Sequence, residues 1–327
     1  MILAYRTRGL SFRWDLLLAT LNDVDRRWLT ASICLILLSN VGRALRWQVM
    51  LRPFGHPLGV WRLTSDTAIG FTAAVVLGRV GEVVRPYLIA VKEGVPATSQ
   101  FAAWVLERIF DLLMALLLFA FALTRVQASG IQVGPKLAWV LAFGGSIVGL
   151  ACVSILAVLL SFRHFAEPAR RRLVAFLRFL PEARFRKMEK LIFAFVQGVE
   201  STRSDGALLA VFLYSLLEWV LIAACYWCLA QAFAGLIDLN LVDVLIFMGF
   251  VSFGSVIQIP GIGGGIQMAS VLVLTELFGV RLELATSFAL LIWILSFVVV
   301  VPVGLGLAVK EGLDWHSLRK IGQEAAQ

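Results

Sequence analysis

Several charged residues of this sequence lie inside long apolar runs. Glu107, Arg108 and Asp111 share one such run, and their spacing places Glu107 and Asp111 on the same face of a helix. Ionisable residues in an apolar segment are costly unless they are paired or hydrated, so they often mark function. Arginine binds phosphate through two parallel hydrogen bonds, and carboxylates hold such arginines or take up protons. The pattern predicts a polar site for a phosphate-bearing group.

Similar residues recur at a glycine-containing break, Gly-Arg-Val-Gly-Glu at 78–82, and Glu218 stands inside another apolar run beside Trp219. We therefore predict a substrate-binding or translocation set and no catalytic residues. The set comprises Arg79, Glu82, Arg85, Glu107, Arg108, Asp111 and Glu218. We also predict broken-helix hinge positions at Gly78, Gly81, Pro260, Gly261, Gly263 and Gly264.

A purely structural interpretation competes with the functional one for each charge. Helix-tying ion pairs, or arginines that extend to a membrane interface, would also place charges here. The two interpretations are evenly balanced for Arg43 and Arg46, which are three residues apart beside Trp47. Asp66 is equally well explained as a helix N-cap. Three charges in one helix favour function for Glu107, Arg108 and Asp111.

The elements that carry these charges have the length of membrane spans. About 20 apolar residues are needed to cross the hydrocarbon core. Five long stretches have or approach this length: Trp28–Val49, Phe101–Leu123, Leu137–Ser161, Ala207–Ala230 and Ala285–Val309. Two further stretches, 63–90 and 242–278, are shorter and are broken by Gly or Pro. The sequence therefore predicts an all-α polytopic membrane protein.

Composition excludes several other classes of protein. Hydrophobic residues make up 60% of the 327 positions and charged residues 15%, which is far from the profile of a soluble enzyme or a disordered chain. No Gly-Lys dipeptide occurs, so there is no P-loop, and ATP-driven transport by this chain alone is excluded. The Cys225–Cys228 pair lacks a second ligand pair, and three histidines are scattered. We expect no metal and no cofactor.

The charge distribution predicts orientation. Residues 162–190 hold nine basic and three acidic residues, so the positive-inside rule makes this segment cytoplasmic. Interleaved apolar residues predict amphipathic helices on the inner leaflet, which favours anionic lipid over nucleic acid as the partner. Alternation of the spans then places the tail after Val309 in the cytoplasm. Similar arginine counts flank Trp28–Val49, so the side of the N-terminus stays open.

The two broken stretches follow the same order of landmarks. Ala97-Thr98-Ser99 opens a long helix after the first, and Ala285-Thr286-Ser287 opens one after the second. The charge argument gives these helices opposite directions, so we predict two inverted repeats, each with a re-entrant segment near the midplane. The predicted organisation is a polar or amphipathic segment 1–27, a first repeat 28–123, a connecting span 124–161, a basic amphipathic linker 162–206, a second repeat 207–309 and a tail 310–327.

These motifs resemble a known family. Arg46-Trp47, the stretch Gly-Arg-Val-Gly-Glu-Val-Val-Arg-Pro at 78–86 and Leu-Glu-Arg-Ile-Phe-Asp-Leu-Leu at 106–113 are similar to the flippase-like membrane domain of lysylphosphatidylglycerol synthases and their stand-alone relatives. The stretch that begins at Pro260 resembles that family's Pro-Gly-Gly-x-Gly. The sequence departs from the family in three ways: residues 1–27 supply no hydrophobic helix ahead of the helix that carries Arg46-Trp47, Gln267 stands where an acidic residue is frequent, and no arginine lies near Trp293.

The resemblance implies translocation of a modified polar lipid without its synthesis, because no soluble aminoacyl-transferase domain accompanies it. We expect a non-enzymatic, flippase-like protein of the cell inner membrane that moves a phospholipid or glycolipid between leaflets, with membrane lipids and a possible lipid-modifying enzyme as partners. Two alternatives stay open. One is an integral-membrane headgroup transferase, and the other is a non-catalytic partner that positions a lipid-modifying enzyme. The lipid, the energy source and the oligomeric state are not predicted.

Overall fold

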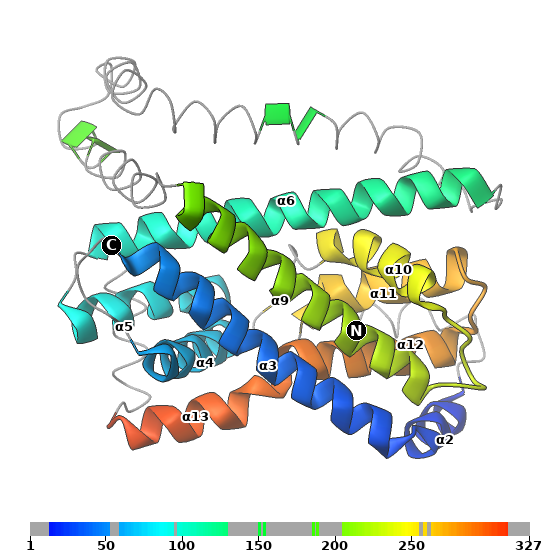
Figure 1. Cartoon of the computed structure of the whole chain (residues 1–327). Coiled ribbons are helices and arrows are strands. Elements are labelled where there is room, and N and C mark those ends of the chain that lie inside the picture. The colour runs from blue at the N-terminus through cyan, green and yellow to red at the C-terminus, as the bar shows by residue number, and fades with distance from the viewer. Residues whose placement is uncertain are drawn as a thin grey trace.

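The computed structural model describes residues 13–52, 59–94, 97–129, 205–254, 258–259 and 263–312, with a few short pieces between 150 and 189. These residues are almost entirely helical (Figure 1). The predicted span Leu137–Ser161 and the basic segment 162–190 lie almost wholly outside the described residues. The first half contains α2 (Trp14–Asp23), α3 (Arg26–Leu51), α4 (Val60–Leu77), the 3-10 helix η3 (Gly78–Val83), α5 (Val84–Glu93) and α6 (Ala97–Ser129).

The second half is also mostly helical. It contains α9 (Asp205–Ala232), α10 (Leu241–Gly254), the strands β1 (Gln258–Ile259) and β2 (Gly263–Gly264), α11 (Gly265–Glu276), α12 (Leu282–Trp293), the π-helical η5 (Ile294–Val298) and α13 (Val300–Lys310). Four segments of the described chain are long and apolar enough to cross a membrane, and they match four of the five predicted spans. They are Arg26–Leu51, Ser99–Ser129, Gly206–Ala232 and Leu282–Lys310.

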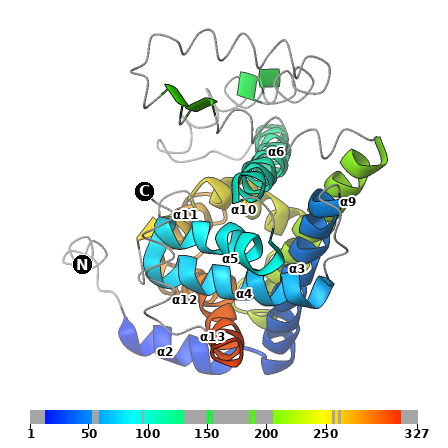
Figure 2. The ribbon, with the colours of Figure 1, turned by 90° about the vertical axis from the view of Figure 1, so that its left-hand side faces the viewer.

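Helices α3 and α9 form an antiparallel pair on one side of the helical body (Figures 1 and 2). The amide of Asp25 donates to the carbonyl of Ala232 at 3.0 Å, which joins the start of α3 to the end of α9. Further along, Ser32 Oγ donates to the Cys225 carbonyl at 3.0 Å. Small polar residues such as Ser32 allow helices to approach closely and hydrogen-bond in an apolar setting. The pair therefore fixes the register between the two halves.

The first break lies where the sequence predicts it. Gly78 adopts φ 68, a left-handed conformation that favours glycine, and η3 follows directly. A Cβ on Gly81 would collide with the backbone of Ala73, so this glycine lets η3 lie against α4. Gly70 of α4 is similarly close to Arg85, where an added Cβ would lie 2.5 Å from the Arg85 Cβ. The break thus brings α5 and Arg85 back onto α4.

The second break has a different geometry. Strands β1 and β2 pair antiparallel, with Gln258 opposite Gly264 and Ile259 opposite Gly263. The predicted hinge residues Gly263 and Gly264 lie in β2 at the start of α11, whereas Pro260 and Gly261 lie outside the described residues. The long helix predicted over Ala285–Val309 is interrupted by η5, where Val299 N donates to the Ile294 carbonyl at 2.9 Å. Such π-turns often occur at functional sites.

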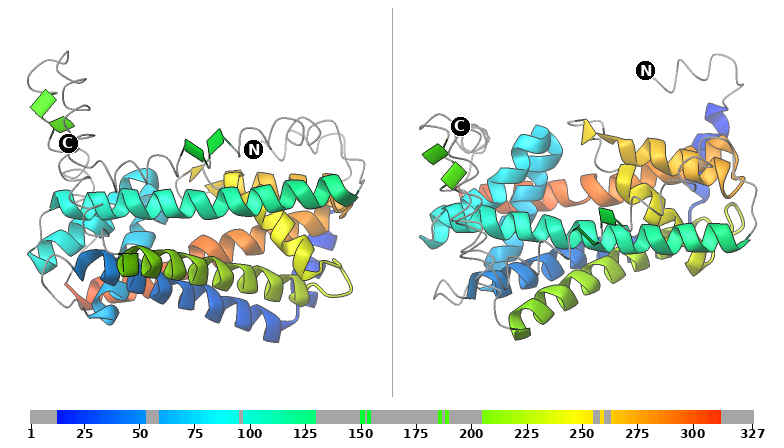
Figure 3. Two further views of the ribbon diagram at one scale, coloured as in Figure 1. Left: turned by 45° about the horizontal axis from the view of Figure 1, so that its top comes forward. Right: turned by 90° about the horizontal axis from the view of Figure 1, so that it is seen from above.

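Helices of one half pack against helices of the other. Helix α13 lies along α4, and α10 lies along α6, which runs the length of the helical body (Figures 2 and 3). At the first of these contacts, a Cβ on Gly304 would collide with the Ala68 carbonyl and with Thr72 Oγ1. The largest apolar cluster joins α6 to α9, α10, α11 and α12, with Phe288 edge-on to Phe233 and Phe247. The halves are therefore interlocked around a shared interior.

Candidate functional site

Arg46 of α3 is a fully buried charge at the centre of the site, with a side chain that is 0% exposed. Its guanidinium binds three carboxylates: Glu107 at 2.5 Å, Asp111 at 2.7 Å and Glu218 at 3.3 Å. It also donates to Ser215 Oγ at 3.0 Å. A buried guanidinium needs such partners, because desolvation of an unpaired charge is very costly. Arg46 therefore ties α3 to both α6 and α9.

Glu107 is the main carboxylate of this cluster and is also 0% exposed. One carboxylate oxygen accepts from Arg46, and the other accepts from Trp47 Nε1 at 2.8 Å and from Arg85. The Arg85 guanidinium additionally lies 4.5 Å from the centre of the Trp47 ring, a cation–π arrangement. Glu107 thus holds two arginines from two different helices, and its role is to orient them.

Two further arginines complete the cluster. Arg43 Nε donates to Glu218, and its guanidinium lies 4.3 Å from the centre of the Phe71 ring. Arg108 pairs with Asp111 at 2.9 Å and keeps 42% of its side chain exposed. Four guanidinium groups and three carboxylates thus interlock, and we call these seven residues the charge cluster: Arg43, Arg46, Arg85, Arg108, Glu107, Asp111 and Glu218. Arg108 keeps exposed guanidinium surface that an anionic ligand can reach.

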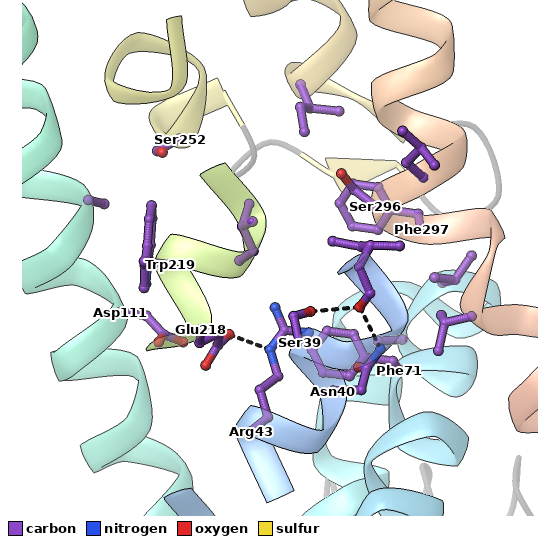
Figure 4. Close-up of a pocket in the computed structure, with 18 of the residues that line it drawn as sticks. Ser39, Asn40, Arg43, Phe71, Asp111, Glu218, Trp219, Ser252, Ser296 and Phe297 are labelled. Carbon is purple, nitrogen blue, oxygen red and sulfur yellow. Dashed lines mark hydrogen bonds and ion pairs between the residues drawn. The ribbon is translucent and has the colours of Figure 1, made fainter. Parts of the chain in front are cut away.

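A cavity of about 410 Å³ opens beside this cluster, lined by residues of both halves of the chain (Figure 4). Five members of the charge cluster line it, whereas Arg46 and Glu107 lie behind its wall. The opposite part of the cavity is mostly apolar and neutral, with residues from α9, α10, α11, η5 and α13. The site is therefore polarised, with charge contributed by α3, α5, α6 and α9.

The structure brings together most of the residues that the sequence singled out. Glu82, Arg85, Arg108, Asp111 and Glu218 line the cavity, and Glu107 supports it from behind. The side chain of Arg79 lies outside the described residues. Glu218, which the sequence shows as a lone charge, pairs with Arg43 and Arg46. For Arg43 and Arg46 the structure shows the ion pairs that the structural interpretation expects.

Sequence reasoning missed the central position of Arg46 and the polar residue Asn40 on the cavity wall. The available signal was the spacing of Arg43 and Arg46 beside Trp47, one turn after Asn40 on the same helix. Helical spacing alone does not reveal partners that lie far away in sequence. Asp111 is 65 residues from Arg46, and Glu218 is 175 residues from Arg43.

A second polar cluster lies where α4, α5 and the end of α13 meet. Lys92 binds both Asp66 and Glu311, and Ser65 Oγ donates to Glu311 at 2.6 Å. Asp66 lies inside α4, which begins at Val60, so its interpretation as an N-cap is wrong. Its side chain is 1% exposed and is compensated by Lys92. This cluster joins the first half of the chain to the last helix.

The Glu311 contacts predict a pH dependence of stability. Partial burial raises the pKa of Glu311, but hydrogen bonds from Lys92 and Ser65 outweigh burial and bring this pKa below its ordinary value. A carboxylate with a lowered folded-state pKa stabilises the fold above its unfolded-state pKa of about 4.3, and this contribution is lost as the pH falls through the folded value. We expect wild type to melt above Glu311→Gln at about pH 6, and the difference to shrink once the pH falls below the unfolded-state pKa.

Thermal unfolding of both proteins in detergent across this pH range measures the effect. The exposed carboxylate Asp23 supplies a control, because Asp23→Asn is expected to follow wild type at every pH. A melting-temperature difference between wild type and Glu311→Gln that stays constant with pH would contradict the prediction.

Metal-ligand chemistry has no support in the described part of the chain, where no group of three or more His, Cys, Asp or Glu side chains could hold an ion. Cys225 and Cys228 are free and buried in α9. The chemistry of the site is therefore carried by guanidinium, carboxylate, hydroxyl and aromatic groups.

Comparison with known proteins agrees with this architecture. Residues 7–304 match the family described as the lysylphosphatidylglycerol synthase TM region. A curated relative is glycosyltransferase AglD of Haloferax volcanii, 30% identical over 114 residues. That match covers 35% of this chain and 18% of the relative, so the similarity concerns a small part of AglD. With four apolar helices of spanning length in the described residues, the chain is a multi-pass membrane protein that belongs to the lysylphosphatidylglycerol synthase transmembrane family.

Proposed function

We propose that this protein moves a polar phospholipid or glycolipid between the leaflets of the bilayer. The polarised cavity carries the proposal: it places the arginine-containing charge cluster beside an apolar wall, between helices long enough to span the membrane. Arg85, Arg108 and Arg43 would attract the phosphate, while Asp111 and Glu218 orient these arginines. A headgroup could then cross at low cost, because its charge would stay paired along the way.

The arrangement of the helices supports alternating access through two inverted repeats. The order of long helix, short helix, break, short helix and long helix recurs in both halves. The contacts recur as well, since α4 packs on α13 as α10 packs on α6. Gly304 approaches the α4 backbone closely, and Gly249 approaches that of α6, where an added Cβ would lie 2.7 Å from the Leu118 carbonyl. Rocking of one repeat against the other is the usual motion of such folds.

The charge distribution supports the orientation within this proposal. In this proposal the protein lies in the cell inner membrane, and the nine basic residues of 162–190 and the segment after Lys310 face the cytoplasm. Lys92, Asp66 and Glu311 would then lie at the cytoplasmic end. Without a P-loop in the sequence, transport would be driven by a gradient or would equilibrate lipid between leaflets.

Lipid exchange between leaflets of proteoliposomes tests the proposal. We expect the purified protein to accelerate the exchange of a fluorescent phospholipid, and Arg108→Gln to slow it at least about tenfold, because a charge-assisted hydrogen bond contributes about 1.5–3 kcal/mol. Arg125→Gln is the matched control, since Arg125 is an exposed arginine of the same helix outside the cavity. Equal exchange rates for both variants would contradict the site, and no acceleration by wild type would contradict the function.

A lipid headgroup transferase is the second candidate, and the partial similarity to a protein named as a glycosyltransferase favours it. Against it, the cavity shows no nucleophile paired with a base among its described residues. Incubation of the protein with labelled lipid and headgroup donors in detergent distinguishes the two, because a transferase forms a new lipid product and a translocator does not.

A further inference from the structure

The cavity wall one helical turn from Arg43 contains a buried hydrogen-bonding atom that has no partner among the described residues. Asn40 of α3 is 7% exposed and lines the cavity. Its Nδ2 donates to the Ile36 carbonyl at 3.2 Å, while its Oδ1 is buried and has no hydrogen-bond partner among the described residues. A buried acceptor left unsatisfied is destabilising and uncommon in native proteins. Asn40 Oδ1 is therefore suited to accept a hydrogen bond from a ligand.

Further hydroxyl groups line the same cavity. Tyr226 of α9 and Ser296 of η5 are hydrogen-bonded to each other at 3.1 Å. A hydroxyl has one donor and two acceptor sites, so this pair retains capacity for a ligand hydroxyl. Ser296 lies in the π-helical turn, which places it on the cavity wall opposite the charge cluster (Figure 4). These groups are neutral, and they match a polyhydroxylated ligand better than a second charge.

Aromatic surfaces flank these polar groups. Trp104 of α6 and Trp219 of α9 line the cavity, and Figure 4 shows Trp219 beside Asp111 and Glu218. Both indoles are only half-buried, so ring surface is left for a ligand. An aromatic face provides apolar contact for the C–H groups of a sugar ring while polar groups bind its hydroxyls, a combination typical of ligand pockets with a few placed polar groups.

We propose that the cavity recognises a glycosyl group attached to phosphate. Arg43 and Arg108 bind the phosphate, Asn40 and the Tyr226–Ser296 pair bind sugar hydroxyls, and Trp219 packs on the ring. The volume of about 410 Å³ accommodates more than a phosphate alone. Asp111 and Glu218 are already occupied by arginines, and Glu82, the third carboxylate on the wall, can accept hydrogen bonds from sugar hydroxyls. The inference rests on the proposed function and assigns its substrate class.

Binding to the purified full chain in detergent tests this assignment separately from transport. The probes are a short-chain glycosyl phospholipid, a phosphatidate with the same chains, an aminoacylated phospholipid and a free hexose phosphate, each titrated by its effect on thermal unfolding. We expect wild type to bind the glycosyl lipid at least about tenfold more tightly than the phosphatidate, equivalent to about 1.4 kcal/mol. Ser296→Ala and Asn40→Ala should each reduce that ratio severalfold.

The control variant is Tyr214→Phe, because Tyr214 is a partly buried tyrosine of α9 that does not line the cavity. It should keep the wild-type ratio, whereas Tyr226→Phe should lower it. Equal binding of the glycosyl lipid and the phosphatidate, or tighter binding of the aminoacylated lipid, would overturn the assignment. A free hexose phosphate that binds as tightly as the glycosyl lipid would support the glycosyl subsite and contradict lipid transport. Selective glycosyl-lipid binding without leaflet exchange would reject only the transport function.

Discussion

Replacing Glu107 by alanine is expected to lower the free energy of unfolding by about 3–5 kcal/mol, as is typical when one partner of a buried ion pair is removed. The side chain is 0% exposed and compensates both Arg46 and Arg85. Its loss leaves two guanidinium groups in an apolar interior with fewer acceptors, and it also removes the partner of Trp47 Nε1. We therefore expect a large decrease in the melting temperature of the protein in detergent.

Matched variants separate the charge of Glu107 from its size. Glu107→Gln keeps the volume and one acceptor oxygen, so it should be destabilised less than Glu107→Ala. Asp238→Ala removes an exposed carboxylate and should change stability by no more than about 0.5 kcal/mol. Combining Glu107→Gln with Arg85→Gln should cost less than the sum of the single changes, because the two groups interact directly. Strict additivity would contradict the ion-pair network.

We expect replacement by alanine to have opposite effects on stability at two glycines of α13, Gly304 and Gly306. A Cβ on Gly304 would collide with the Ala68 carbonyl and Thr72 Oγ1 of α4, whereas a Cβ on Gly306 would meet nothing within 4 Å. Gly304→Ala must push α13 away from α4, and such overpacking costs about 1–3 kcal/mol. Gly306→Ala should stabilise the helix by up to about 1 kcal/mol, because alanine has the higher helix propensity.

The measurement is the melting temperature of the two variants under identical conditions. Both variants replace a glycine of α13 by alanine, at positions two residues apart, so they have the same composition and differ only in what the added methyl group meets. Melting temperatures that fall equally, or a Gly304→Ala variant as stable as wild type, would show that the close contact between α4 and α13 does not limit stability. If the inverted-repeat proposal is correct, Gly304→Ala should also slow lipid exchange, since this contact must slide during rocking.

Some features follow from sequence because they depend on local periodicity. The apolar length of Trp28–Val49 and Ala207–Ala230 determined two spanning helices, since a run of this length is stable only when buried in lipid or protein. The glycines at 78 and 81 indicated a break, and in the structure α4 ends at Leu77 and the 3-10 helix η3 follows. The sequence motifs also pointed to the family that the comparison shows.

Other features depend on contacts that sequence spacing does not encode. The i,i+3 and i,i+4 rules relate residues within one helix, and by those rules Arg46 and Glu218 were unconnected charges. Packing of α3 on α9 and the approach of α6 made Arg46 the centre of the charge cluster. Contact of α5 with α4 placed Lys92 against Asp66.

The sequence by itself determined that this chain is a multi-pass helical membrane protein with a small set of charges inside its apolar segments. Only the tertiary structure decided which charges pair with each other and which face a cavity. The physical reason is that desolvation forces buried charges to find partners, while the identity of those partners depends on how distant helices pack. Asn40 illustrates this: an ordinary polar residue in sequence, it lines the cavity with a buried acceptor that a ligand can satisfy.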